Sequence, residues 1–254
     1  MRHPTPSRLI PHGAPTAYFT FPGLTAAGLP HATTTRHCPG VAGPAETTAP
    51  LGDAAGTLLA SAGFDLARLA WARQVHGAAV VVAPPGGGFV GAADAIVTGE
   101  RAVPLAVVTA DCLAITLWDP EVPALAVAHA GWRGTAGGVT SAVVESLTRL
   151  GAQPGRLRVA IAPSIGPCCY EVDDPVADVF ARAYPEAWRA WFEPHGAGRF
   201  MLDLWRANES LLAVAGVRPE RIENARMCTA CRPDLLYSYR KGNRGRLVTV
   251  AALP

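Results

Sequence analysis

The chain has 254 residues, of which 50% are hydrophobic and 17% are charged, with a formal net charge of +2 at pH 7. This composition is typical of a compact globular protein and excludes an intrinsically disordered chain. The small net charge and the lack of any basic run give no indication of nucleic-acid binding. The sequence contains no internal repeat and no low-complexity linker, so we predict a single domain over residues 1–254.

The N-terminal segment MRHPTPSRLIPHGAP is interrupted by prolines and has no apolar core, so we predict no signal peptide. We expect residues 1–17 to form a loose arm. The most apolar stretch, Ala102–Trp118, contains Pro104 and Asp111 and is too strand-like to span a membrane. The six cysteines are scattered rather than arranged as a dense disulfide framework. This usage favours a cytoplasmic protein with reduced thiols.

Short apolar runs separated by Gly/Pro turns indicate strands, and longer periodic runs indicate helices. In chain order, the predicted strands of the first half are Thr33–Thr35, Leu69–Val75, Ala78–Val82, Ala95–Thr98, Leu105–Thr109, Leu113–Trp118 and Leu125–Ala128, with a short helix at Thr57–Ala62. The second half is predicted to contain helices at Val139–Leu150, Pro175–Trp191 and Phe200–Val214, and strands at Arg158–Ala162, Leu235–Tyr239 and Leu247–Ala252. Strands joined partly by turns and partly by helices predict a mixed α/β protein in which helices cover two stacked sheets.

Three of the predicted strands are followed, within three residues, by a chemically reactive side chain. The segments are RQVHG (73–77), TADCL (109–113) and AVAHAGWRGTAGG (126–138), and they contain His76, Cys112 and His129. These residues are too far apart in sequence for one local metal loop, but neighbouring strand ends would bring them together. Two imidazoles and a thiolate suit zinc or copper with an open position. A Cys–His pair equally suits nucleophilic catalysis, and the pattern leaves both possibilities open.

The glycine-rich turn after His129 is a candidate anion site. Its glycines allow a tight backbone path, and the helix that it opens presents unpaired N–H groups. Arg133 within the turn supplies a fork-shaped donor, and Thr135 is a candidate cap for the following helix. The alternative is a loop that serves helix packing alone.

The remaining cysteines are predicted to line loops. Adjacent Cys168 and Cys169 are expected to point in different directions, so that one metal rarely takes both, and Cys168 is expected either to line a pocket wall or simply to be buried. Cys228 and Cys231 form a CxxC motif without the second CxxC or His pair of a zinc ribbon. His37 and Cys38 are treated as an incidental pair, because a metal site needs three or four ligands.

Four segments together resemble one family. They are RQVHG, ADAIVT with TADCLAI, AVAHAGWRGTAGG, and IAPSIGPCCYEV followed by CTAC and LYSYRKGNRGR, and they span roughly residues 70–250. The chain is thereby identified as similar to the laccase-domain proteins, which are also named multicopper polyphenol oxidases, peptidoglycan editing factors or purine nucleoside phosphorylases of the laccase-domain type.

The resemblance implies a four-layer α/β/β/α fold and one zinc, or copper, held by His76, Cys112 and His129. It implies phosphorolysis of adenosine, inosine, guanosine and methylthioadenosine, and deamination of adenosine. Zinc lowers the pKa of a bound water towards about 7, as deamination requires. Arg133 would hold phosphate, and Trp132 is expected either to stack on the purine or to lie in the core. Asp111 is a candidate proton donor or partner of a ligand histidine, with a turn cap as the alternative.

Three alternatives stay open. In the first, Cys112 is a thiolate nucleophile activated by His129 in an amide hydrolase that edits a peptidoglycan precursor. The second is a copper-dependent phenol oxidase, which the seven histidines disfavour because a multicopper oxidase needs about ten. The third is a binding module with a structural metal, which a fourth ligand from Cys168, Cys228 or Cys231 would favour.

The chain departs from the family at one place. Family members usually carry an SLNLG-like segment and an Asn-Arg pair before QVHG, whereas the segment TTAPLGDAAGTLLASAG (47–63) keeps only Leu51 and Gly52. The candidate substrate or anion ligands that remain are Arg36, Gln74, Arg133, Gly134, Cys168 and Arg240. The partners expected are a purine nucleoside and phosphate, with no nucleic acid and no membrane, and the pattern leaves the oligomeric state open.

Overall fold

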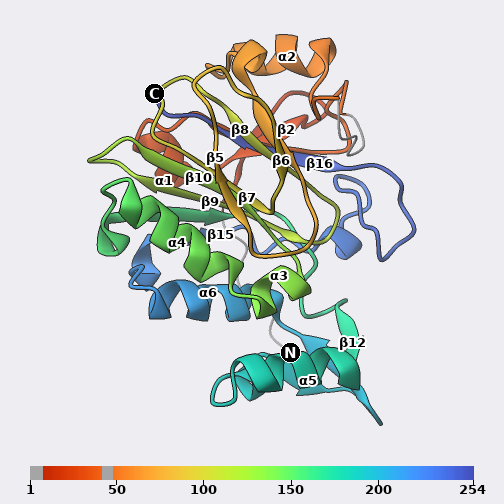
Figure 1. Cartoon of the computed structure of the whole chain (residues 1–254). Helices are drawn as coiled ribbons and strands as arrows, with labels where there is room; N and C mark the ends of the chain where they lie inside the picture. The colour runs from red at the N-terminus through yellow and green to blue at the C-terminus, as the bar shows by residue number, and fades with distance from the viewer. Residues whose placement is uncertain (1–7, 42–47) are drawn as a thin grey trace.

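The computed structural model describes residues 8–41 and 48–254, and over these residues two large sheets lie face to face (Figure 1). The first sheet, in spatial order, consists of β1 (Ile10–His12), β2 (Tyr18–Thr20), β3 (His31–Thr34), β16 (Leu247–Ala251), β8 (Leu105–Thr109), β4 (Ala70–Arg73) and β6 (Gly88–Ala92). The second consists of β15 (Ile222–Asn224), β11 (Arg158–Ile161), β9 (Leu113–Asp119), β10 (Ala124–Ala130), β7 (Ala95–Thr98) and β5 (Val80–Val82). Both sheets are mixed, because β4 runs parallel to β8, and β5 runs parallel to β7, among otherwise mostly antiparallel pairs.

Alternation along the strands builds the four layers. In β10, Leu125 and Val127 face the first sheet, whereas Ala126 and Ala128 face the helices on the outer side. Side chains alternate because successive residues of a strand point to opposite faces. A third apolar cluster joins the outer face of the first sheet to α2 (Asp53–Ala60). The order is therefore helix, sheet, sheet, helix, as the resemblance implied.

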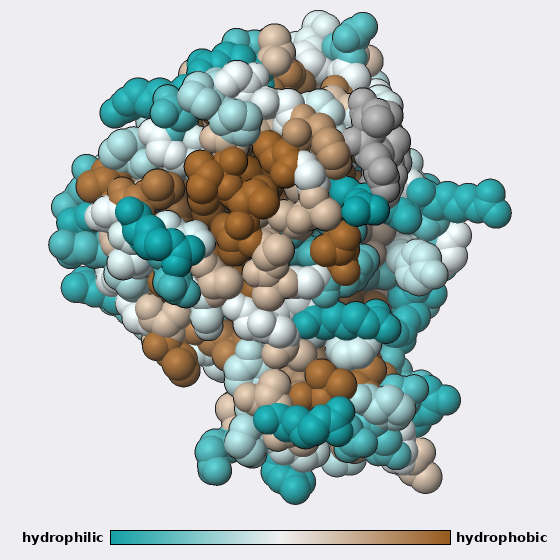
Figure 2. Space-filling model, viewed as in Figure 1, coloured by the Kyte–Doolittle hydropathy of each residue, from teal (hydrophilic) through white to brown (hydrophobic). Residues whose placement is uncertain are grey.

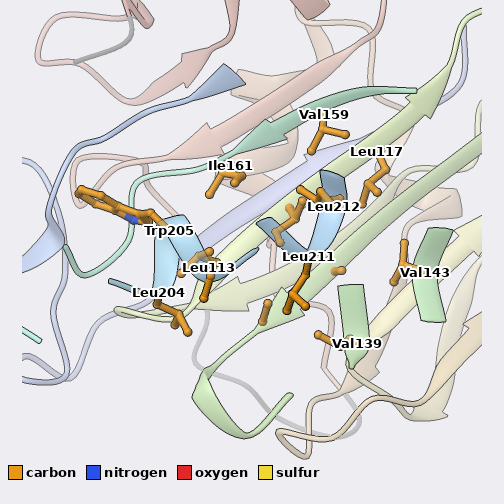
Figure 3. Packing of buried hydrophobic residues seen from close by; sticks show 14 of the residues in the cluster. Leu113, Leu117, Val139, Val143, Val159, Ile161, Leu204, Trp205, Leu211 and Leu212 are labelled. Atoms are coloured by element: carbon orange, nitrogen blue, oxygen red, sulfur yellow. The ribbon is translucent and has the colours of Figure 1, made fainter. Parts of the chain in front are cut away.

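The helices on the outer face of the second sheet complete its core. They are α3 (Trp132–Ala136), α4 (Val139–Arg149) and α6 (Leu204–Val214). The short helix α1 (Pro22–Ala26) lies near the edge of the first sheet. Figure 3 shows Leu204, Trp205, Leu211 and Leu212 of α6 beside strand residues such as Leu113 and Ile161. A fully buried leucine stabilises a fold by roughly 1.5–3 kcal/mol relative to exposure, so this interface fixes the helices firmly.

A small third sheet extends from this body together with α5 (Asp174–Ala183), at the bottom of Figure 1. Its strands are β12 (Glu171–Asp173), β14 (Arg199–Leu202) and β13 (Phe192–Pro194). The sequence predicts two long helices here, but the structure shortens both. Pro185 disfavours helical backbone at Tyr184, so α5 ends at Ala183. Asp203 accepts a hydrogen bond from the backbone N–H of Arg206 and caps α6, so residues 199–202 are free to pair as β14.

Two further predictions are wrong. The segment expected to be a loose arm contains β1, which pairs with β2 in antiparallel register; the rest of that arm, residues 1–7, lies outside the described residues. The predicted strand Leu235–Tyr239 is instead a turn, in which the N–H groups of Leu235 and Leu236 both donate to the carbonyl of Arg232. Leu236 is fully buried, although it belongs to none of the strands found in the described residues.

The surface combines charged side chains with one apolar area. Figure 2 shows apolar residues gathered over the edge strands β5 and β6, where Val82 and Phe89 are exposed. Within the described residues, no helix is long and apolar enough to cross a membrane.

Candidate active site

The structure brings His76, Cys112 and His129 together, and we call them the His–Cys–His cluster. His76 follows β4, Cys112 directly precedes β9, and His129 is the last residue but one of β10. One ligand atom from each lies within 4.8 Å of the others. Antiparallel pairing of β9 and β10 places Ala130 opposite Leu113, so the thiol and the second imidazole are neighbours by register. In the part of the chain that the structure describes, no fourth His, Cys, Asp or Glu donor joins this group.

Asp94 organises the cluster, and sequence analysis missed this role. Its carboxylate lies 2.8 Å from Nδ1 of His129, which leaves Nε2 of that ring for the cluster. The same carboxylate accepts the backbone N–H groups of Val75, His76 and Gly77, at 3.2, 2.9 and 2.6 Å. Asp94 is buried, and these hydrogen bonds keep its pKa low although burial alone would raise it. It therefore fixes both histidines as an ionised acceptor.

Two residues of the site have left-handed backbone conformations that non-glycine residues rarely adopt. The φ angle is 59° at His76 and 91° at Asp111, the residue before Cys112. Such conformations cost on the order of 1–3 kcal/mol each and persist where surrounding contacts hold them. At His76 the contacts are the hydrogen bonds to Asp94. At Asp111 the carbonyl accepts the N–H of Ile165 at 2.8 Å.

Asp111 does not contact a ligand histidine. Its carboxylate accepts from the hydroxyls of Thr229 and Ser238, at 2.5 and 3.1 Å, and from the backbone N–H of Arg240 at 2.7 Å. It lies in the cavity wall and ties the chain segment 229–240 to the short segment between β8 and β9 that carries Cys112. The ligand-orienting interaction expected of Asp111 belongs to Asp94 instead.

The cluster stabilises negative charge on sulfur. Burial by itself would raise the pKa of Cys112, but hydrogen bonds from His129 and His76 outweigh it and lower the pKa to about 7. Burial likewise opposes the charged form of His129, yet Asp94 and Cys112 raise its pKa to about 9. The thiolate is the form of cysteine that binds metals and attacks electrophiles, so both chemistries inferred from the sequence remain available.

Two glycines allow the chain to approach the cluster closely. A Cβ atom at Gly131 would lie 2.9 Å from Sγ of Cys112 and 3.2 Å from Cδ2 of His76. A Cβ atom at Gly134 would lie 2.8 Å from the carbonyl oxygen of Gly77. Gly134, a candidate anion ligand, lies in α3 against the loop that carries His76. Thr135, a candidate cap for the next helix, instead contacts Asn208, and Gly138 occupies the N-cap position of α4.

A cavity of about 570 Å³ opens over the cluster, within the range of about 300–1,000 Å³ usual for ligand sites. Its wall includes the aromatic and cationic side chains of Trp132, Arg133, Tyr170, Tyr239, Arg240 and Arg246. The guanidinium of Arg133 lies 4.3 Å from the ring centre of Trp132, and that of Arg240 lies 5.3 Å from the ring centre of Tyr170. Burial and the charge of Cys112 raise the pKa of Tyr170, so its hydroxyl stays neutral.

The other candidate ligands differ in position. Gln74 lines the cavity, but its amide already bridges the N–H and C=O of Val108, both at 2.7 Å. Arg36 is not among the described residues that line the cavity, because its guanidinium donates to the carbonyl of Pro233 and lies 5.0 Å from the ring centre of Tyr237. Sequence analysis missed Tyr170 and Arg246, since no local motif distinguishes a cavity-lining tyrosine or arginine from a surface one.

Cys168 belongs to a second group of thiols rather than to the cavity wall. One Sγ atom from each of Cys168, Cys169, Cys228 and Cys231 lies within 4.8 Å of the others, and we call this group the four-cysteine cluster. The expectation that adjacent Cys168 and Cys169 point apart is wrong, because both sulfurs face Cys231, at 3.6 and 3.5 Å.

Comparison with known proteins gives consistent matches. A family model described as multi-copper polyphenol oxidoreductase laccase matches residues 52–254. The chain is 39% identical over 198 residues to the purine nucleoside phosphorylase YlmD of Geobacillus stearothermophilus, covering 73% of this chain and 72% of that protein. It is 38% identical over 241 residues to a purine nucleoside phosphorylase of Deinococcus radiodurans, covering 89% of this chain and 90% of that protein.

Two further matches concern chemistry and fold. The adenosine deaminase RL5 of an unknown prokaryotic organism is 35% identical over 208 residues, covering 78% of this chain and 79% of that protein. The crystal structure of YlmD from Geobacillus stearothermophilus superposes with a TM-score of 0.84 at 29% identity, covering 96% of this chain and 99% of that chain.

Proposed function

This chain belongs to the family of multi-copper polyphenol oxidoreductase laccases, and we propose that it is a zinc-dependent enzyme that cleaves purine nucleosides with phosphate and deaminates adenosine. The observation that carries the proposal is the mixed His–Cys–His cluster, which no fourth protein donor joins among the residues that the structure describes, beside a cavity of nucleoside size. The names of the relatives, purine nucleoside phosphorylase and adenosine deaminase, support the substrate class.

The residues present fit a zinc ion. Two imidazoles and one thiolate are the donor types that zinc prefers, and catalytic zinc sites keep three protein ligands and one open position. Gly131 has no side chain, and this leaves free the space beside Cys112 and His76 that a Cβ atom would fill. Asp94 holds Nδ1 of His129, a hydrogen bond that metal-ligating histidines usually make.

When bound, zinc would supply an acidified water and a Lewis acid to the reacting carbon. The chain's own residues would bind and orient the substrate. Trp132 and Tyr170 provide aromatic surface for a purine, and each is paired with an arginine. Arg133, Arg240 and Arg246 line the same cavity and provide the positive charge that a phosphate co-substrate requires.

The cavity arginines are candidate replacements for the Asn-Arg pair that family members usually carry and that this chain lacks. Arg133 and Arg240 come from segments far from the altered region before QVHG, and both face the cavity. Phosphate binding in this chain is therefore proposed to depend on Arg133 and Arg240, with Arg36 serving the 233–237 turn instead. Replacement of Arg240 by Gln is expected to raise KM for phosphate more than KM for adenosine.

A second candidate function is amide hydrolysis by a thiol. It is favoured by the sequence of contacts from Cys112 to His129 to Asp94. The Asp94 carboxylate lies 2.8 Å from Nδ1 of His129 and would orient this imidazole as the general base. A multicopper oxidase has less support, because in the described part of the chain only His76 and His129 join a potential metal group and a three-copper centre needs more imidazoles.

The test is incubation of metal-characterised protein with adenosine, with and without phosphate, followed by chromatography of the products. Adenine that forms only with phosphate establishes phosphorolysis, and inosine that forms without phosphate establishes deamination. Activity should disappear on chelation and return with Zn²⁺. Turnover of a dipeptide or acyl-amide substrate by the chelated protein, with no turnover of adenosine by the zinc form, would support the thiol hydrolase and overturn the nucleoside enzyme.

A further inference from the structure

The four-cysteine cluster is assembled from two loops that the backbone holds side by side. Cys168 and Cys169 lie in a turn between β11 and β12, whereas Cys228 directly precedes the 3-10 turn Thr229–Cys231 and Cys231 is its last residue. Ser164 forms a parallel bridge with Cys228, and the N–H of Thr229 donates to the carbonyl of Ser164 at 3.1 Å. The four thiols therefore meet through regular backbone pairing.

The first loop is anchored to the protein core. The indole N–H of Trp205 donates to the hydroxyl of Ser164 at 2.7 Å, and both side chains are buried. A Cβ atom at Gly166 would lie 2.6 Å from the same indole ring, so only glycine allows this approach. The turn that follows is closed by the N–H groups of Cys169 and Tyr170, which both donate to the carbonyl of Gly166. This closed turn directs both adjacent thiols towards Cys231.

We propose that Cys168, Cys169, Cys228 and Cys231 bind one zinc ion, separate from the His–Cys–His cluster, through four thiolates. A Zn–S bond of about 2.3 Å places tetrahedral sulfurs about 3.8 Å apart. The two Cys231 contacts, at 3.5 and 3.6 Å, are close to this spacing, and all four sulfurs lie within 4.8 Å of one another. A small contraction of the most distant pair completes the tetrahedron.

Four thiolate ligands favour a zinc ion at this site. Binding of Zn²⁺ to four thiols releases four protons and gives a site with a net charge of −2. The backbone N–H of Gly166 donates to Sγ of Cys228 at 3.3 Å, and the side chain of Arg240 reaches the carbonyl of Cys169 at 3.4 Å, so donors and a cation surround the site. An iron–sulfur cluster also uses four cysteines, but its inorganic sulfide requires more space between them.

The proposed ion would be structural, since four protein ligands close its coordination shell. It would join two segments that contribute to the cavity wall, because Tyr170 directly follows Cys169 and Arg240 reaches back to the same loop. The site is independent of the proposed nucleoside chemistry, and its occupancy can be measured without any substrate.

The experiment is an anaerobic titration of the reduced, chelator-stripped full-length protein with Co²⁺, a spectroscopic substitute for zinc. Thiolate-to-cobalt absorption increases with the number of Co–S bonds, so it distinguishes the two clusters. Cys112→Ser removes the one thiolate of the His–Cys–His cluster and isolates the other site. We expect this variant to bind one Co²⁺ with four-thiolate absorption, and Zn²⁺ to displace it and abolish the colour.

Two further variants complete the design. Cys112→Ser/Cys231→Ser should lose the four-thiolate absorption and bind Co²⁺ at least about 100-fold more weakly, whereas Cys112→Ser/Cys38→Ser removes an unrelated buried cysteine and should retain both properties. If Cys112→Ser does not fold by circular dichroism, Cys112→Ala, which also removes this thiolate, replaces it as the background. A folded background variant that binds no Co²⁺, or binds it with the absorption of one or two thiolates, would overturn the proposal.

Discussion

The two clusters, each a candidate metal site, differ in their donors and in what holds them. The His–Cys–His cluster has mixed donors, lies at strand ends beside a cavity, and depends on one buried carboxylate, Asp94, for orientation. The four-cysteine cluster has sulfur donors alone, lies on two loops, and depends on backbone pairing. Three donors leave a coordination position for chemistry, whereas four close the shell and serve stability. The first cluster is thus the candidate for chemistry, and the second is the candidate for a structural role.

The largest expected effect comes from replacing Cys112 by Ala. The three ligand side chains act as a unit, so kcat/KM for adenosine should fall roughly 10³-fold or more. Metal analysis of the same variant should show loss of the ion at this cluster and retention of the ion at the four-cysteine cluster. Cys38→Ala is the control, since Cys38 is buried in the apolar cluster beside α2 and should not affect turnover. If Cys112→Ala turned over adenosine at the wild-type rate, the His–Cys–His cluster would not be the reacting centre.

Asp94→Asn is expected to produce the next largest effect. An amide cannot accept from His129 and from three backbone N–H groups as a carboxylate does. Metal affinity at the His–Cys–His cluster should fall about 10- to 100-fold, with a matching fall in activity at limiting zinc. Isothermal titration with Zn²⁺ measures this change. An unchanged affinity would mean that the backbone alone orients the two histidines.

Asp119→Asn is the matched control for that substitution. Asp119 is also buried and accepts two backbone N–H groups, but its cationic partner is Arg156 and it lies outside both clusters. The substitution should cost about 1–3 kcal/mol of unfolding free energy at pH 7 and leave zinc affinity unchanged.

The pH dependence of this control has a defined sign. Burial opposes the charge of Asp119, but Arg156 and the backbone N–H groups of Gln153 and Glu121 together more than compensate and keep its pKa below the unfolded value of about 3.9. Its contribution is present above that value and is lost as pH falls through the lower folded pKa. Denaturant titrations should show the difference between wild type and Asp119→Asn narrowing below about pH 4.

Gly131→Ala is expected to have an intermediate effect. The added methyl group would lie 2.9 Å from Sγ of Cys112, which corresponds to overpacking of about 1–3 kcal/mol. Zinc should bind the His–Cys–His cluster about ten-fold more weakly, while the four-cysteine cluster stays unaffected. Gly56→Ala in α2 is the control, because its Cβ would meet only Leu66 at an ordinary 3.6 Å. Equal effects of the two substitutions would contradict the close approach at Gly131.

Cys231→Ser should have the smallest effect on turnover and a clear effect on stability. With saturating zinc at the other cluster, we expect kcat to change by less than about three-fold. The increase in melting temperature that zinc gives the wild type should be reduced, since a ligand that binds only the folded state stabilises it. Differential scanning calorimetry of the wild type and of Cys231→Ser, each with and without Zn²⁺, measures the change in melting temperature. A full loss of kcat would indicate that the four-cysteine cluster takes part in the reaction.

The sequence predicted the central strands well because they are short apolar runs ended by Gly, Pro or Asp. The structure has Ala95–Thr98 and Leu105–Thr109 with the expected bounds. The predicted strand at Leu235–Tyr239 was wrong, because an apolar residue such as Leu236 can be buried in a turn as well as in a sheet. Local hydrophobicity predicts burial, and burial alone does not decide backbone conformation.

The sequence by itself determined which residue types stand at the strand ends, and so which three side chains form the His–Cys–His cluster. Only the tertiary structure decided their partners. Asp94 reaches His129 because β7 pairs with β10 in a register that places Ala95 opposite Ala128. The four cysteines meet because a bridge at Ser164 aligns two loops that are distant in the chain. Strand ends follow from local patterns of a few residues, whereas register and loop pairing follow from packing across the whole chain.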